Sequence, residues 1–210
     1  LLSMTIPKEQ ADIIAKTTKK HLYNYKQGGY HLNEDYKEVK LNMGRAYGFR
    51  YNHKENGAVF SHMALMYVSG LFNYKLTDYA REGLYALMDR AMDNTSLVPL
   101  GIPEYFTEKG IGKYFYLTGS ATWLLLVIKE SLFGIKYHEG KTYIIPQLSK
   151  DDFIDGYAEI KTIHYGKETT FKFYNKNHLD RYNITIKAQG QTLKQGFDRH
   201  YKEIEVHCHD

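Results

Sequence analysis

The first 134 residues carry apolar side chains at the spacing of α-helices. This pattern predicts helices over residues 7–23, 57–72, 76–92 and 120–132. In the first and third segments the apolar residues gather on one face: Ala11, Ile14, Ala15 and Leu22, then Ala80, Leu84, Leu87, Met88 and Ala91. The second and fourth segments are apolar nearly all round, which is typical of buried helices. Gly134 follows the fourth segment, where a glycine cap is expected.

Beyond Gly134 the apolar residues alternate with polar ones, as they do in half-buried strands. The alternation predicts strands over residues 142–145, 158–163, 169–174, 182–186 and 204–208. Pairs ending in glycine separate several of them and predict tight turns: Glu139-Gly140, Tyr165-Gly166 and Gln189-Gly190. We therefore expect helices followed by a small antiparallel β domain. The long polar and aromatic segment between the first two helices, residues 23–56, is expected to be functional.

Composition excludes several classes of protein. The 210 residues are 43% hydrophobic and 25% charged, as in ordinary globular proteins and not in disordered chains. A net charge of +4 is too small and too evenly spread to indicate nucleic acid binding. The longest apolar run, residues 123–128, is too short to span a membrane. The single cysteine, Cys208, cannot form a disulfide within the chain, so we expect a cytoplasmic protein.

Two segments carry candidate anion-binding residues. Thr118, Gly119 and Ser120 precede an apolar helix, where free backbone N–H groups attract phosphate or carboxylate. A plain helix cap would use the same residues. His62 lies among apolar residues of the second helix, where it is either a core histidine or a donor to an anion near neutral pH.

Other polar residues are candidates for binding sugar hydroxyls. Lys54, Glu55 and Asn56 form a polar cluster before the second helix, and they could equally cap that helix. Glu104 lies in a turn flanked by aromatic residues, where it could bind a sugar, act as an acid or bond to the loop backbone.

The tail offers a candidate pair of metal ligands. His207 and His209 would share one face of a strand. Two ligands are too few for a metal site, so we expect an edge strand there and no bound metal.

Taken together, these segments resemble glycoside hydrolase family 94, which contains cellobiose, chitobiose and related β-glucoside phosphorylases. The resemblance rests on K-E-N-G-A-V-F-S-H at residues 54–62, I-P-E-Y-F at 102–106, Y-L-T-G-S-A-T-W at 116–123 and F-G-I at 133–135. Their order and spacing match the C-terminal part of that family through nearly the whole chain. The segment N-M-G-R-A-Y-G at residues 42–48 is more similar to the branch that acts on 1,2-β-oligoglucans.

The resemblance implies a multidomain fold in which helices precede strands. Residues 1–135 would supply the last helices of an (α/α)6 barrel, and residues 136–210 a C-terminal antiparallel β-sandwich of the jelly-roll type. It also implies reversible, inverting phosphorolysis of a β-linked gluco-oligosaccharide to a sugar 1-phosphate. Inorganic phosphate is then a substrate, no cofactor or metal is needed, and no membrane takes part. The full-length protein would be a homodimer.

Site residues carry over by position. His62, Thr118 and Gly119 match the residues that bind phosphate in the family, and Lys54 and Glu55 match the region that lines the acceptor-sugar site. The family's general acid is an aspartate in an Asp-Trp-Asn context upstream of this region, whereas the single tryptophan here, Trp123, follows Thr122. We therefore expect no catalytic residue in this chain, which would be a C-terminal fragment of the enzyme and inactive alone.

Two other interpretations remain open. The chain could be a non-catalytic carbohydrate-binding or docking module, because two helices that are apolar nearly all round need more packing partners than four helices supply. It could also be a hydrolase on the same scaffold, although a hydrolase has no use for residues that bind phosphate.

Overall fold

The computed structural model describes residues 1–115 and 119–210, with the backbone only at residues 45 and 46. The chain divides into two compact units, Leu1–Val127 and Ile128–Asp210. The boundary that we expected at residue 135 lies within the second unit.

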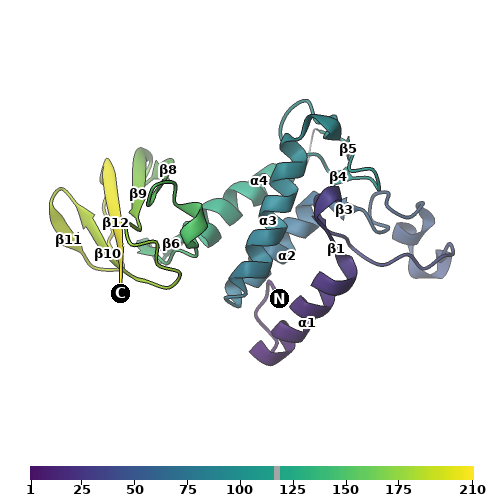
Figure 1. The fold of residues 1–210 in the computed structure, drawn as a ribbon, viewed down its shortest axis with the longest axis horizontal. Helices are drawn as coiled ribbons and strands as arrows, with labels where there is room; N and C mark the ends of the chain where they lie inside the picture. Colours follow the sequence, from purple (N-terminus) through teal and green to yellow (C-terminus); the bar gives the residue numbers. More distant parts are fainter. Residues whose placement is uncertain (116–118) are drawn as a thin grey trace. The chain divides into compact units, whose positions relative to one another are not determined.

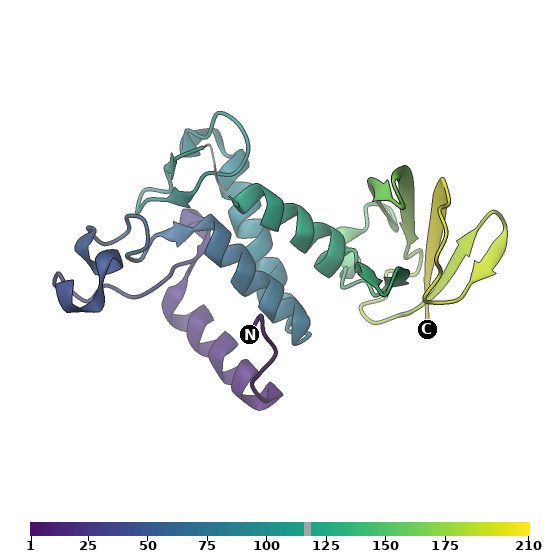
Figure 2. The same cartoon turned by 180° about the vertical axis from the view of Figure 1, so that it is seen from behind.

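Three of the predicted helices lie in the first unit close to their expected limits. They are α1 (Lys8–Leu22), α2 (Ser61–Asn73) and α3 (Thr77–Met92). Figures 1 and 2 show α2 and α3 side by side, with α1 beside them. The expected apolar faces point inward, since Ala11, Ala15, Ala80 and Leu84 are fully buried. Among the residues of the chain that the structure describes, no helix has the length and apolar character needed to cross a membrane.

A tyrosine ring packed against a glycine joins α3 to the strand pair that follows α1. That pair is β1 (Tyr23–Asn24) and β2 (Gly29–Tyr30), linked by the 3-10 turn Tyr25–Gln27. The Tyr30 ring packs on Gly83 of α3 so closely that a Cβ atom at Gly83 would lie 2.6 Å from it. A side chain larger than hydrogen therefore does not fit at residue 83.

The fourth predicted helix has its expected limits, but it changes type along its length and is more exposed than expected. It begins as α4 (Ser120–Leu126) and continues as the π-helix Val127–Leu132. Leu125 is 68% exposed, so the prediction of a helix buried all round is wrong for this segment. The predicted glycine cap is present, because Gly134 has φ +70° and ends the turn.

The loops of the first unit contain short 3-10 turns and two-residue strands. The 3-10 turns Leu41–Met43 and Arg45–Gly48 lie in the long segment between β2 and α2, and Asn94–Ser96 follows α3. A three-stranded sheet contains β3 (Val59–Phe60), β4 (Tyr105–Phe106) and β5 (Gly112–Lys113), with β4 in the middle. The sequence did not predict this sheet, which brings the candidate site residues together.

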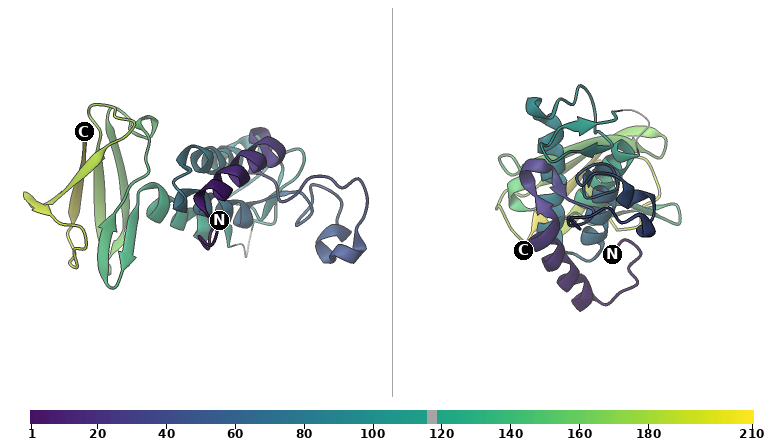
Figure 3. Two further views of the ribbon diagram at one scale, coloured as in Figure 1. Left: turned by 90° about the horizontal axis from the view of Figure 1, so that it is seen from below. Right: turned by 90° about the vertical axis from the view of Figure 1, so that its right-hand side faces the viewer.

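The second unit contains a five-stranded sheet, seen on the left of the left-hand view in Figure 3. Its spatial order is β11-β10-β12-β9-β8. The strands are β8 (Tyr157–His164), β9 (Lys167–Tyr174), β10 (Asn183–Ala188), β11 (Gln191–Leu193) and β12 (Glu203–His209). A separate hairpin pairs β6 (Ile135–His138) with β7 (Lys141–Ile144), and a 3-10 turn, Lys150–Asp152, follows it.

The predicted strands and turns of this unit are confirmed. Each of the three glycine-ending pairs connects two antiparallel strands with positive φ at both residues, as in Tyr165 (φ +49°) and Gly166 (φ +75°). Alternate side chains form the core: Phe171, Phe173, Ile204 and Val206 are completely buried.

The expected fold class is wrong. An (α/α)6 barrel needs six helix pairs, whereas the described residues form four α-helices and twelve strands, and no such barrel is present among them. The second unit is not a purely antiparallel sandwich, because β12 inserts between β9 and β10 and runs parallel to β9. The prediction of an edge strand at the tail is wrong for the same reason. Alternation of apolar residues identifies a strand but does not say which neighbour it pairs with.

We predict that Gly83→Val destabilises the first unit by about 1–3 kcal/mol, because the new side chain would overlap the Tyr30 ring. Urea unfolding followed by circular dichroism measures the change. Met92→Val is the matched control, at a position of the same helix that is 79% exposed. Equal stability of the two variants would contradict the packing described for Gly83.

We also predict that acid destabilises the second unit through His164. This side chain is fully buried among the rings of Tyr137, Tyr165, Phe171 and Phe197. Burial, helped by the positive charges of His200 and Lys129, lowers the pKa of His164 from 6.5 to about 4. The unfolded chain therefore binds the proton first, and the stability contributed by neutral His164 is lost as the pH falls from 6.5 toward 4, by about 1.4 kcal/mol per pH unit.

Hydrogen exchange of β9 amides between pH 6.5 and 4.5 measures this loss. His164→Gln should remove this part of the slope, while the control His138→Gln, at an exposed position, should keep it. An unchanged slope in His164→Gln would show that another group causes the acid sensitivity.

Candidate functional site

The three-stranded sheet brings together three segments that are distant in the sequence. Tyr105 of β4 pairs with Phe60 of β3 on one side and with Lys113 of β5 on the other. At the end of this sheet the Ser61 N–H donates to the Glu104 carbonyl at 2.9 Å, so the start of α2 is fixed against the turn that carries Glu104. Figure 1 shows β3, β4 and β5 beside the start of α2. The segments 54–62 and 102–106, singled out separately in the sequence, are thus brought together with residues 112–114 in one local site.

Lys54 is held on this site by an acidic and an aromatic side chain. Its ammonium lies 3.5 Å from a Glu104 carboxylate oxygen and 3.9 Å from the centre of the Tyr114 ring. Both contacts stabilise the positive charge, one as an ion pair and the other as a cation–π interaction. Burial lowers the pKa of Lys54. The negative charge of Glu104, and that of Tyr114 when it is ionised, raise the pKa by more than burial lowers it, so the pKa lies above its ordinary value of 10.5. Lys54 therefore presents a fixed positive charge.

The turn that carries Lys54 is fixed by hydrogen bonds of buried and half-buried polar side chains. The Asn33 amide accepts from the Gly57 N–H at 2.8 Å and donates to the Asn56 amide oxygen at 3.1 Å. His31 Nδ1 donates to the Gly57 carbonyl at 2.5 Å. Burial lowers the pKa of His31, against the opposing effect of its hydrogen bonds, so the ring tends to stay neutral while it holds the turn. Glu55 is half-buried in the same turn, beside Lys54.

Two of the three predicted phosphate residues lie in contact. His62 occupies the first turn of α2, and Gly119 immediately precedes α4. A Cβ atom at Gly119 would lie 3.1 Å from the His62 ring, so glycine allows the imidazole to approach the backbone. The ring of Trp123 lies 5.9 Å from that of His62, between centres. Thr118, the third predicted residue, lies outside the described residues.

Contacts with the Glu104 turn also fix the start of α4. The Ser120 hydroxyl is buried and donates to the Pro103 carbonyl at 3.4 Å. Pro103 and Glu104 are adjacent in this turn. Pro103 contacts Ser120, the residue after Gly119, and Glu104 pairs with Lys54. The His62–Gly119 pair and the Lys54–Glu104 pair therefore share one support.

Sequence reasoning missed part of this site. It considered Glu104 as a sugar ligand or an acid, but did not pair it with Lys54, and it did not single out Tyr114. Tyr114 has φ +57°, an uncommon backbone conformation for a tyrosine, directly after β5. The aromatic run K-Y-F-Y after Gly112 is the signal that could have drawn attention to it.

The polar tail of the second unit forms a different arrangement. His207 lies 3.0 Å from a Glu205 carboxylate oxygen, and His209 lies 3.1 Å from the Thr185 hydroxyl. No group of three or more potential metal ligands was found among the residues that the structure describes.

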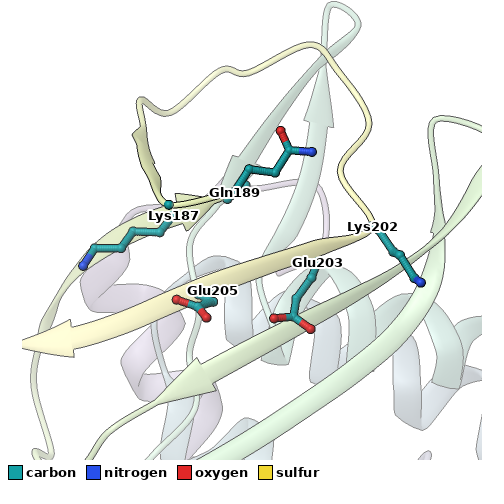
Figure 4. Close-up of a pocket in the computed structure, with 7 residues that line it drawn as sticks. Lys187, Gln189, Lys202, Glu203 and Glu205 are labelled. Atoms are coloured by element: carbon teal, nitrogen blue, oxygen red, sulfur yellow. The ribbon is translucent and has the colours of Figure 1, made fainter.

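A cavity of about 370 Å³ lies near β10 and β12, with Lys187, Lys202, Glu203 and Glu205 around it (Figure 4). Glu203 forms an ion pair with Lys172 at 2.6 Å, and Glu205 stands opposite Lys187 in the strand pairing. These charges are explained as cross-strand pairs of the sheet.

We predict that Glu104→Gln lowers the pKa of the Lys54 ammonium, because the variant removes the negative charge that raises it most. Titration of the Lys54 side-chain carbon signals by NMR measures the change. Glu108→Gln is the control, since Glu108 pairs with Arg50 and not with Lys54. An unchanged Lys54 pKa in Glu104→Gln would contradict the ion pair.

No family model matches the chain, and no curated protein matches it. The function of the chain therefore has to be argued from its residues and their geometry.

Proposed function

We propose that this site binds inorganic phosphate and a β-linked gluco-oligosaccharide, as the phosphate and acceptor-sugar side of an inverting β-glucoside phosphorylase. One observation carries the proposal: segments 54–62 and 102–106, which carry much of the resemblance, meet at one sheet, and Gly119 of the third segment touches His62. The Glu104 turn supports both arrangements, because Glu104 pairs with Lys54 and Pro103 contacts Ser120, the residue after Gly119.

The His62–Gly119 contact supports the phosphate half of the proposal. A phosphate dianion needs donors that match its charge, and an imidazole beside backbone N–H groups supplies them without a metal. Glycine at residue 119 keeps this approach open, because any larger side chain would meet the ring.

The Lys54–Glu104 pair supports the sugar half of the proposal. The ammonium donates and the carboxylate accepts, so together they can bind neighbouring hydroxyls of one sugar ring. Glu55 lies beside Lys54 in the same turn and adds a second carboxylate. The Tyr114 ring offers an apolar surface for the C–H face of the sugar.

The resemblance implies the reaction in which these residues would take part. A phosphate oxygen forms a bond to the anomeric carbon on the face opposite the leaving oxygen, and the glycosidic C–O bond breaks. The leaving oxygen takes a proton from a carboxylic acid, and the product is a sugar 1-phosphate of inverted configuration. Positioning of phosphate for in-line attack is the contribution of this chain. No residue here matches the family's general acid, so we expect the chain alone to bind both ligands without turnover.

The tryptophan beside His62 provides the test. Trp123 is the single tryptophan of the chain, so its fluorescence reports on this site alone. Titration of the full chain with inorganic phosphate should change this fluorescence in a saturable way. His62→Ala should weaken phosphate binding about 10- to 100-fold, as expected for loss of a charge-assisted hydrogen bond.

His138→Ala is the matched control, because its side chain is 74% exposed in the second unit. This variant should bind phosphate as the original chain does. The proposal fails if phosphate leaves Trp123 fluorescence unchanged, or if His62→Ala binds phosphate with undiminished affinity. Sugar binding that persists without any phosphate binding would instead favour a non-catalytic carbohydrate-binding module.

A further inference from the structure

The outer strand of the five-stranded sheet in the second unit has an open side. β8 stands at the end of the sheet, and among the described residues β9 is the one strand that pairs with it. That pairing continues without a bulge from Tyr157 to His164, and the strand contains no proline. A long, regular edge of this kind is a template for pairing with another strand.

The direction of the backbone groups along this edge follows from the bonds at its beginning. The N–H and C=O groups of Tyr157 both bond to Ile154, on the side away from β9. Because these groups alternate in direction along an antiparallel strand, those of Glu159 and Lys161 also point away from β9. Ile154 occupies the outer side of β8 only at Tyr157, so the open stretch begins at the next residue.

The side chains on this edge carry opposite charges at matching positions. Glu159 and Lys161 lie on the solvent face of β8, where their side chains are 39% and 63% exposed. Within one copy the two charges form only a long ion pair, at 3.9 Å. A charged residue usually protects a sheet edge from pairing. Here the two charges are opposite in sign and two positions apart, so the strand is complementary to a second copy of itself that runs antiparallel.

We propose that two copies of this chain associate through antiparallel pairing of their β8 strands. In the register that places Ile160 opposite Ile160 of the second copy, Glu159 of each copy lies opposite Lys161 of the other. The outward backbone groups of Glu159 and Lys161 can then form the hydrogen bonds between the copies. The two nearest registers with the same hydrogen-bond pattern would place Glu159 or Lys161 opposite its own counterpart, and like charges there are unfavourable. This interface depends neither on the resemblance to family 94 nor on the proposed function.

The neighbouring side chains fit the same register. Ala158 lies opposite Thr162 of the second copy, so the inner face of the pairing contains only small or apolar groups. Two exposed isoleucines flank the stretch: Ile154, which is 80% exposed, and Ile163, which is 60% exposed. The two-fold arrangement brings Ile163 of each copy toward Ile154 of the other, which removes apolar surface from water.

Analytical ultracentrifugation of the full chain, at protein concentrations from about 1 to 100 μM, tests this proposal. We expect a dimer whose fraction rises with concentration. Lys161→Glu should weaken dimerisation about tenfold, because it sets carboxylates against carboxylates at two places in the pairing. Glu159→Lys should have the same effect through opposed ammonium groups. The double variant that carries both changes should restore the dimer, since each new charge again faces its opposite.

Two further measurements separate loss of pairing from loss of folding. Lys161 lies opposite Thr170 of β9, so Lys161→Glu sets no charge against another on that strand, and its circular dichroism spectrum should match that of the original chain. Glu139→Lys is the matched control, because it makes the same change of charge at an 81% exposed side chain outside β8 and should dimerise normally.

Four results would overturn the proposal. The first is a chain that stays monomeric over this range of concentration. The second is a dimer that neither Lys161→Glu nor Glu159→Lys weakens, and the third is a double variant that remains monomeric. The fourth is a control, Glu139→Lys, that loses the dimer to the same extent as Lys161→Glu.

Discussion

The pairing of β4 between β3 and β5 is the constraint on which the candidate site depends. These strands have two residues each, yet they place Glu104 within reach of Lys54 and bind its backbone to the start of α2. Residues 103–105 are contacted by the Lys54 turn, by α2, by β5 and by the residue that follows Gly119. Loss of this pairing would separate the groups that we propose to bind phosphate from those that we propose to bind sugar. The position of each site residue therefore depends on the pairing of this sheet.

Hydrogen bonds of polar side chains fix the conformation of the loops at this site. A loop without regular structure usually has many accessible conformations, and ordering it is costly. Here Asn33 and His31 bond to the backbone of Gly57, and Asn56 donates to the Phe49 carbonyl. Asn56 is buried, and leaving its amide unpaired would cost about 1–3 kcal/mol. The turn also needs Gly57, whose φ of +75° and contact with Tyr51 exclude other residues.

Local pattern predicted much of the secondary structure, and the reason is physical. The faces of α1 and α3 and the alternation in β8, β9 and β12 follow directly from burial on one side, and glycine-ending turns specify hairpins. Pairing between distant segments leaves no comparable signal, so the sheet β3–β4–β5 and the parallel neighbours β12 and β9 were missed. His62 and Gly119, which the resemblance assigns to one phosphate site, lie close together, but the barrel that it implies is not formed by the described residues. The polar cluster of residues 54–56 drew attention to Lys54 in the sequence. Its contacts with Glu104 and Tyr114 became evident only in the structure.

Phosphate binding by His62 and Gly119 is the property on which the proposed function depends. Amide NMR spectra of the full chain, recorded as inorganic phosphate is added, test it most directly. We expect saturable shifts that are concentrated at His62, Gly119 and Ser120, with the amides of the second unit unchanged. Shifts that are absent, or that are scattered over surface lysines of both units without saturation, would contradict it.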